Sequence, residues 1–287
     1  MNDQVWTIGR VVRWAADDFR AKGIESPRLE AELLLAYVLG VERMRILLDQ
    51  DRPLTPDELA RFREIIKRRR AREPVAYIRG EREFYGRVFR VDARVLIPRP
   101  DTEILVETAL RRTQHLSMSG RVLDLCTGSG CVATTFALER PTWQVTGTDL
   151  SEGAIEVARD NAHRLGAVWN VRWLVGDLFE PIGDERFDLI TANPPYIPLA
   201  EKQELSPDIR EHEPHLALFG GDDGFAITSR IIHEAPRHLR KRGVLAMEIG
   251  AGQADEVAAL FEKAGFVEVE RTRDYGGHER VVSGVAP

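Results

Sequence analysis

The sequence has two cysteines, no long apolar run and no excess of basic residues. Cys126 and Cys131 cannot form the disulfide framework of a small secreted domain, and we expect both to be small buried apolar residues. No run approaches the roughly 18 apolar residues that a membrane-spanning helix needs. The opening residues, MNDQVWTIGR, lack the basic and then apolar pattern of a secretory leader. These absences favour a cytoplasmic protein.

Charge and histidine placement exclude further classes. The net charge of −6 argues against a general coat for nucleic acid. We expect no metal centre, because His212 and His215 have no cysteine near them in sequence and scattered carboxylates are weak indicators. The basic run at 61–72, RFREIIKRRRAR, has two interpretations. It is a solvated helix end, which suits the helix dipole, or a contact for an acidic or RNA-rich partner; we favour the first.

Helix signals dominate the first part of the chain. Apolar positions recur at helical spacing over 5–22, and the segments 26–40 and 55–70 each open with a hydroxyl residue followed by proline. The alternating segment 83–98 predicts a β-hairpin, and 99–113 predicts another helix. We therefore expect a small helical domain at the start of the chain, followed by a hairpin.

Strand and helix signals alternate from residue 120 onward. Such alternation predicts an α/β domain in which a parallel sheet is covered on both faces. The expected strands are 121–127, 143–150, 171–177, 187–193, 243–250 and, as the last strand, 266–274, and the expected helices are 132–140, 151–166 and 252–265. The predicted division of the chain is a helical domain over 1–80, a hairpin linker over 81–98 and the α/β domain over 99–287.

Three loops that follow expected strands carry ligand-binding signals, and ligands bind at the carboxyl ends of the strands in such a sheet. Gly128 and Gly130 in LDLCTGSG allow a tight turn and a close approach to a ligand at a helix N-terminus. Asp149 follows about 20 residues later, where a carboxylate can hold ribose hydroxyls. Asp177 either accepts a hydrogen bond from an adenine amino group, with Leu178 or Phe179 beside the ring, or is an ordinary loop aspartate.

The fourth loop, Asn193-Pro194-Pro195-Tyr196, is unusually stiff. Both prolines lack an N–H and hold φ at about −65°, and the residue before each proline is pushed to extended conformations. The corner therefore presents an amide, a carbonyl and an aromatic ring in a predictable way, which suits a planar polar group. The first three loops fit a nicotinamide-dependent oxidoreductase or a methyltransferase that uses S-adenosylmethionine. Of these two classes, only the methyltransferase explains the fourth loop.

NPPY with LDLCTGSG upstream resembles the methyltransferases that modify planar sp² nitrogen: adenine N6, guanine N2 or the glutamine side-chain amide. REPVAYIRGEREFYG, VLIPRPDTE, EPHLALFGGDDG and MEIGAGQ narrow the resemblance to the protein-(glutamine-N5) methyltransferase family HemK/PrmC. Members methylate the glutamine of the Gly-Gly-Gln loop in peptide chain release factors. The resemblance runs over most of the chain, and it departs from the family at Cys126, where the family usually has glycine.

This resemblance implies a Rossmann-like methyltransferase domain that uses S-adenosyl-L-methionine, joined by a β-hairpin to a small N-terminal helical domain that recognises the substrate. The implied partners are peptide chain release factors, with no membrane and no direct nucleic-acid substrate. The alternatives are a methyltransferase acting on an exocyclic amino group of a nucleic-acid base or on a ribosomal-protein glutamine, an NAD(P) oxidoreductase, and a non-catalytic binding module. The net charge of −6 and the lack of an inserted base-recognition domain count against a nucleic-acid base as the substrate.

The candidate catalytic residues are Asn193, Pro194 and Tyr196, and Pro195 joins them in substrate binding. Our hypothesis is that the Asn193 side-chain oxygen and the Pro194 carbonyl each accept one N–H of the substrate amide, while Tyr196 packs on the amide and excludes water. The candidate cofactor-binding residues are Asp124, Cys126, Thr127, Gly128, Ser129, Gly130, Asp149, Leu150, Asp177, Leu178 and Asn193.

Four charged residues outside these loops have open roles. Arg99 and Glu103 in PRPDTE either help to close the active site or follow a helix cap as surface charges. By resemblance, Glu213 and the glycines of FGGDDG shape the substrate channel. Glu248 is either part of the site or a buried strand-end carboxylate with a structural role.

Overall fold

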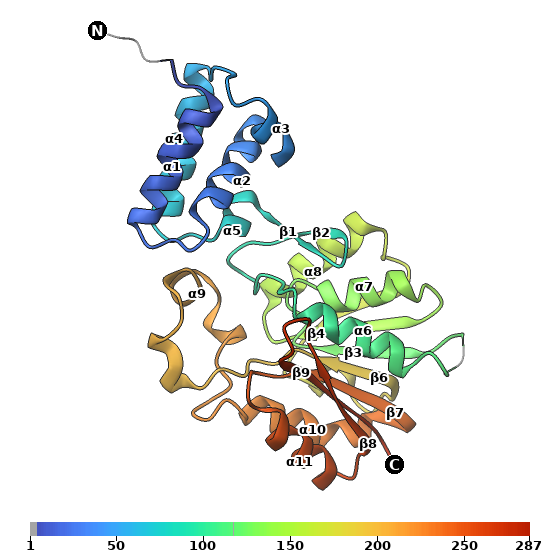
Figure 1. The fold of residues 1–287 in the computed structure, drawn as a ribbon. Coiled ribbons are helices and arrows are strands. Elements are labelled where there is room, and N and C mark those ends of the chain that lie inside the picture. Colours follow the sequence, from blue (N-terminus) through green and yellow to red (C-terminus); the bar gives the residue numbers. More distant parts are fainter. Residues whose placement is uncertain (1–4, 117) are drawn as a thin grey trace. The chain divides into compact units, whose positions relative to one another are not determined.

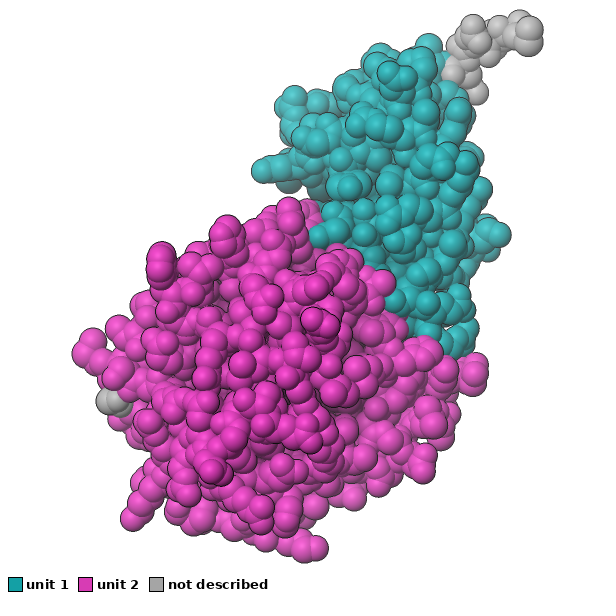
Figure 2. Space-filling view, turned by 180° about the vertical axis from the view of Figure 1, so that it is seen from behind, with its two compact units in different colours: residues 1–80, 207–212 teal, residues 81–206, 213–287 magenta. Residues whose placement is uncertain are grey.

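The computed structural model describes residues 5–116 and 118–287, and these form two compact units (Figure 2). One unit comprises the chain up to Gly80 together with Pro207–His212. The other comprises Glu81–Ser206 and Glu213–Pro287. The helical unit thus takes in a short piece of chain from the region 99–287, far along the sequence from the rest of it.

The helical unit is built around three longer helices. Buried apolar residues on α1, α2 and α4, among them Phe19, Leu34 and Phe62, form its core. Thr55 begins α4 with a reciprocal capping box to Glu58, as its sequence pattern indicates. The helices are α1 (Ile8–Ala21), α2 (Pro27–Leu39), α3 (Arg43–Leu48), α4 (Pro56–Arg70), α5 (Val75–Arg79) and α9 (Pro207–His212). The three short helices were not predicted, because so few residues show no helical periodicity.

The basic run at 61–72 is largely used within its own unit. Arg68 pairs with Glu73, and Arg70 pairs with Asp18 on α1. Arg69 is buried and pairs with Glu30 on α2. These partners favour the helix-end interpretation of the run over a free basic surface.

The expected β-hairpin forms but ends earlier than predicted. It pairs β1 (Glu81–Phe84) with β2 (Arg87–Arg90) in antiparallel register. Tyr85 and Gly86, the two turn residues, both have positive φ, which suits a tight two-residue hairpin turn. The Tyr85 N–H donates to the Glu103 carboxylate at 2.8 Å, so Glu103 supports this turn.

The described residues of the larger unit form a seven-stranded sheet in the order β5-β4-β3-β6-β7-β9-β8. The first five strands in this order run parallel, and β9 is antiparallel to both its neighbours. The strands are β3 (Arg121–Leu125), β4 (Gln144–Asp149), β5 (Val171–Val175), β6 (Phe187–Ala192), β7 (Leu239–Glu248), β8 (Val267–Arg273) and β9 (Glu279–Val285).

The prediction of a wholly parallel sheet ending at 266–274 was wrong at one edge. β9 follows β8 through a turn at 274–278 and inserts between β7 and β8. Gly284 weakens its strand signal. In the fold that glycine is needed, because a Cβ there would lie 2.9 Å from the Phe261 ring.

Helices cover both faces of the sheet (Figure 1). Alternate residues of each central strand point to opposite faces: Leu123 of β3 packs with α10 and α11, and Val122 packs with α7. The helices are α6 (Thr102–Arg112), α7 (Cys131–Glu139), α8 (Glu152–Leu165), α10 (Ala226–His238) and α11 (Ala254–Lys263). Helix α10 was not predicted, and Pro236 inside it hides its pattern.

The strand order indicates where a ligand-binding crevice should lie. β4 and β6 lie on opposite sides of β3, so the chain reverses its direction of growth at β3. A crevice is expected outside the carboxyl ends of the strands at such a point. In the described part of the chain, no helix combines the length and the apolar composition needed to cross a membrane.

Candidate active site

A pocket opens at the carboxyl ends of β3, β4, β5 and β6, and all four loops singled out in the sequence contribute to it. Gly130, Pro194 and Tyr196 lie outside its wall. The candidate residues that line it are Asp124, Cys126, Thr127, Gly128, Ser129, Asp149, Leu150, Asp177, Leu178, Asn193 and Pro195. The structure therefore brings most of the candidates together around one cavity.

Asp124 joins two strands beneath the pocket. Its carboxylate accepts hydrogen bonds from the Thr127 hydroxyl at 2.5 Å and from the Thr191 hydroxyl at 2.7 Å. Burial raises the pKa of Asp124 to about 6, and the two hydroxyl donors partly oppose this rise. Asp124 thus fastens the glycine loop after β3 to the end of β6.

Asp149 holds the glycine loop from the neighbouring strand. One of its oxygens accepts the Gly128 N–H at 2.9 Å, and the other accepts the Ser151 N–H at 2.9 Å. Burial raises the pKa of Asp149, while these backbone donors lower it. Ser151, not Asp149, caps α8 by accepting the Ala154 N–H. The carboxylate is therefore free of the capping role and faces the pocket.

Two non-glycine residues of the pocket wall have left-handed backbone conformations. Cys126 has a φ of 55° and Leu178 a φ of 48°. Residues with a side chain rarely adopt such values, and strained positions of this kind cluster at functional sites. The position of Cys126 favours glycine, which agrees with the residue that the resembling family usually has there. Next to Leu178, Asp177 is ion-paired with Arg230 at 2.8 Å at the pocket rim.

Asn193 is held by a residue that sequence reasoning missed. Its Nδ2 donates to the Thr102 hydroxyl at 3.2 Å, so that Oδ1 is the side-chain atom available to an incoming donor. Thr102 begins α6, 91 positions away along the chain. The only sequence signal for this role was its place within PRPDTE.

Tyr196 and Glu248 meet behind the NPPY loop. The Tyr196 hydroxyl lies 3.5 Å from Oε1 of Glu248, which is long for a hydrogen bond. Burial raises the pKa of Glu248 to about 7 and also raises the pKa of Tyr196, an effect that the nearby carboxylate strengthens. Glu248 Oε2 is buried without a hydrogen-bond partner among the described residues. Glu248 is buried and does not line the pocket. This favours its interpretation as a buried strand-end carboxylate with a structural role.

The FGGDDG and MEIGAGQ motifs brace the NPPY backbone. A Cβ on Gly220 would lie 2.4 Å from the Pro195 carbonyl oxygen, and one on Gly224 would lie 2.4 Å from the Tyr196 carbonyl oxygen. The Gln253 side chain donates to that same Tyr196 oxygen at 3.0 Å. These glycines therefore pack closely against the loop backbone, and their role in shaping a substrate channel stays a prediction.

Arg99 and Glu213 form a pair at the opposite wall. Arg99 lines the pocket and donates to Glu213 at 2.5 Å, while the Ile97 N–H donates to the same carboxylate at 3.2 Å. Glu213 is only 4% exposed. Arg99 and Glu103 of PRPDTE thus separate: Arg99 belongs to the pocket wall and Glu103 to the hairpin turn.

The chemistry of the wall fits one class of ligand. Three carboxylates, Asp124, Asp149 and Asp177, line the pocket together with apolar residues such as Leu150 and Leu178. They suit a ligand with a cationic group, hydroxyls and an aromatic base, but Arg94 and Arg99 also line the pocket and Asp177 is paired with Arg230, so the wall is mixed in charge. No cluster suited to a metal ion occurs among the residues that the structure describes.

The fold, together with the match of residues 100–211 to the methyltransferase small domain, is that of a Rossmann-like methyltransferase. A methyltransferase from Pyrococcus furiosus has the same fold, with a TM-score of 0.53 and 20% identity over 70% of this chain and 90% of that one. Residues 100–211 match the methyltransferase small domain, and residues 10–80 match the PrmC N-terminal domain.

Relatives with higher sequence identity show which methyltransferase family the chain belongs to. A release factor glutamine methyltransferase of Geobacter sulfurreducens is 46% identical, covering 98% of this chain and 97% of its own length. That of Chlorobaculum tepidum is 41% identical over 99% of both chains. The chain belongs to the release factor glutamine methyltransferase family.

Proposed function

We propose that this protein transfers a methyl group from S-adenosyl-L-methionine to the side-chain amide nitrogen, N5, of the glutamine in the Gly-Gly-Gln loop of peptide chain release factors. The observation that carries the proposal is the orientation of Asn193. Its Nδ2 is engaged by Thr102, and its Oδ1 is left as an acceptor at the end of β6, in the wall of the pocket. Release factors act in translation, so we expect the reaction to occur in the cytoplasm.

The residues at the strand ends fit the cofactor. In this proposal Asp149 holds ribose hydroxyls, Asp177 accepts from the adenine amino group, and Asp124 is assigned to the amino-acid end of the cofactor. Leu150 and Leu178 supply apolar surface for the base, and the left-handed glycine loop allows a close backbone approach. When bound, S-adenosylmethionine supplies an electrophilic methyl group on a positively charged sulfur.

The acceptor side must make an amide nitrogen nucleophilic. Its lone pair is delocalised into the carbonyl group, so it attacks poorly in water. Asn193 Oδ1 and the Pro194 carbonyl accept its two N–H groups, hold the nitrogen in one orientation and favour the pyramidal geometry that frees the lone pair. Tyr196 excludes water from the amide. No base is needed beforehand, because the methylated nitrogen loses its extra proton readily.

A substitution at Asn193 tests this function. We expect Asn193→Ala to lower the rate of label transfer from S-adenosylmethionine to a release factor by about 10²–10³-fold, the size of effect seen when one preorganised hydrogen-bonding group is removed. Asn170→Ala is the matched control, since Asn170 bonds backbone carbonyls at the far end of β5. Full turnover by Asn193→Ala would contradict the proposal.

A further inference from the structure

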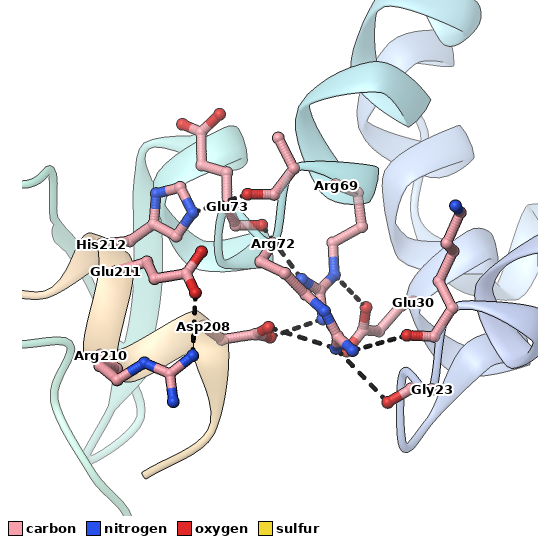
Figure 3. Close-up of polar contacts among 11 residues, drawn as sticks. Gly23, Glu30, Arg69, Arg72, Glu73, Asp208, Arg210, Glu211 and His212 are labelled. Carbon is pink, nitrogen blue, oxygen red and sulfur yellow. Dashed lines mark hydrogen bonds and ion pairs between the residues drawn. The ribbon is translucent and has the colours of Figure 1, made fainter. Parts of the chain in front are cut away.

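Arg69, in the last turn of α4, is among the largest fully buried side chains of the described residues, with 2% exposure. Its Nε lies 2.5 Å from the Glu30 carboxylate on α2, and its Nη2 lies 2.6 Å from the Asp208 carboxylate on α9 (Figure 3). A buried guanidinium needs acceptors for its donors, because an unpaired charge in the interior is costly. Asp208 supplies one of these acceptors from 139 positions away.

The other end of α9 is held at the same place. The His212 ring Nε2 lies 2.8 Å from the Ala71 carbonyl oxygen, and Arg72 adds an ion pair to Asp208 at 3.6 Å (Figure 3). A helix of six residues is not stable alone in water. Its conformation therefore depends on this docking against the C-terminal end of α4.

The chain enters the pocket wall directly after α9. Glu213 is the next residue, and its buried carboxylate binds Arg99 and the Ile97 N–H. Pro214, Leu216 and Ala217 line the pocket. One residue after leaving the helical unit, the chain thus forms contacts that shape the cavity.

We propose that Asp208 is a positioning residue for the transfer reaction. By binding Arg69 it holds α9, and it thereby holds the following segment 213–217 in the conformation that forms the pocket wall. The kinetic part of this inference rests on the proposed function. Asp208 touches neither the pocket nor a reacting group, so it acts through the segment that it anchors.

The test compares Asp208→Asn with Asp18→Asn in the full chain. Asp208→Asn leaves the Arg69–Glu30 pair in place, so the helical unit keeps its buried pair. Asp18→Asn removes a more exposed ion pair, to the neighbouring Arg70 on the same helix, without touching α9. Amide hydrogen exchange over 208–218, melting temperature, and the kcat and KM of transfer to a release factor are measured for each.

We expect Asp208→Asn to speed exchange over 208–218 and to lower kcat about tenfold, since a charge-assisted bond is lost, with KM changed less than about threefold. Asp208→Glu restores part of the rate, and Asp18→Asn changes neither exchange in this segment nor kcat. The melting temperature of Asp208→Asn should stay close to that of the wild type, because asparagine keeps an oxygen that can accept from Arg69 and the Glu30 pair remains.

The inference would be overturned by unchanged exchange over 208–218, by faster exchange without a loss of kcat, or by equal losses in the Asp18→Asn control. A general rise in exchange with a lower melting temperature would show a merely structural contact and would overturn it as well. A wild-type protein that never labels the release factor would instead refute the proposed function. The exchange measurement needs no substrate and then decides by itself whether Asp208 holds the segment.

Discussion

The two sides of the pocket are assembled in different ways. On the cofactor side, contacts join residues that are close in sequence or on adjacent strands, such as Asp124 with Thr127 and Asp149 with Ser151. On the acceptor side, contacts join distant segments: Asn193 bonds Thr102 across 91 positions, and Gln253 bonds Tyr196 across 57. One side is a local motif, and the other is a product of tertiary packing.

This difference implies different sensitivities. A local loop keeps its geometry as long as its strand and helix form. The NPPY loop depends on α6, on the FGGDDG segment and on the start of α11 all being in place. Because small misplacements of a reacting group can cost large factors in rate, substitutions far from the acceptor in sequence should impair transfer.

The largest expected effect outside Asn193 comes from Gly224→Ala. Its Cβ would lie 2.4 Å from the Tyr196 carbonyl oxygen, and its φ of 82° disfavours any side chain. We expect the free energy of unfolding to fall by about 2–4 kcal/mol and transfer to weaken. Urea unfolding and transfer kinetics measure both quantities.

Gly252→Ala is the control for this change. Gly252 has a φ of 83°, but a Cβ there would meet no atom within 4 Å, so it isolates the backbone strain. If the two variants lose equal stability and activity, the brace behind NPPY has no role.

Glu248→Gln tests the buried carboxyl group behind Tyr196. Burial raises its pKa to about 7 from an ordinary 4.5, so the native state binds this proton more tightly than the unfolded chain does. The resulting stabilisation is present at pH 4.5 and below and is lost as pH rises towards 7. The variant does not titrate, so its stability relative to wild type should rise with pH, by up to about 3 kcal/mol.

Urea unfolding of both proteins from pH 5 to pH 8 measures this difference. Asp101, Arg280 and Tyr196 are the charged or titratable neighbours that act on Glu248, and all are kept in both proteins. A difference that stays constant over this range would show that Glu248 does not titrate there.

Thr102→Val should have a smaller effect, confined to the acceptor side. It keeps the shape of the side chain but removes the oxygen that orients the Asn193 amide. We expect kcat to fall about tenfold, because the amide can then turn its donor towards the substrate. Thr102→Ser retains a hydroxyl and should recover most of the rate. Equal rates for the valine and serine variants would exclude the orienting role.

The smallest effect is expected on the cofactor side, at Cys126. At an ordinary position alanine is more favourable than glycine, but here the φ of 55° reverses the order. Cys126→Gly should be more stable than Cys126→Ala by about 1 kcal/mol, as measured by urea unfolding. The opposite order would mean that the loop changes conformation when the thiol is removed.

The cofactor side could be predicted from the sequence because its signals are local. A strand followed by Gly128 and Gly130, and then Asp149 at the end of the next strand, directly predict a loop and a carboxylate at one sheet edge. The stiffness of Pro194 and Pro195 likewise marked the fourth loop.

The partners of that loop could not be predicted in the same way. Nothing near Thr102 or Gln253 in sequence indicates that the fold carries them to the end of β6. Strand β9 and helix α9 were missed for related reasons: Gly284 weakens one pattern, and six residues are too few to show the other. The pairing of Arg69 with Asp208, 139 positions apart, could therefore not be predicted from the sequence.

The most direct test of the whole account is methyl transfer from labelled S-adenosylmethionine to three acceptors measured side by side. These are an intact release factor, the same factor with the glutamine of its Gly-Gly-Gln loop changed to alanine, and duplex DNA. The account predicts label on the intact factor alone. Label on DNA, or on none of the three despite cofactor binding, would contradict the assignment of a glutamine amide to this site.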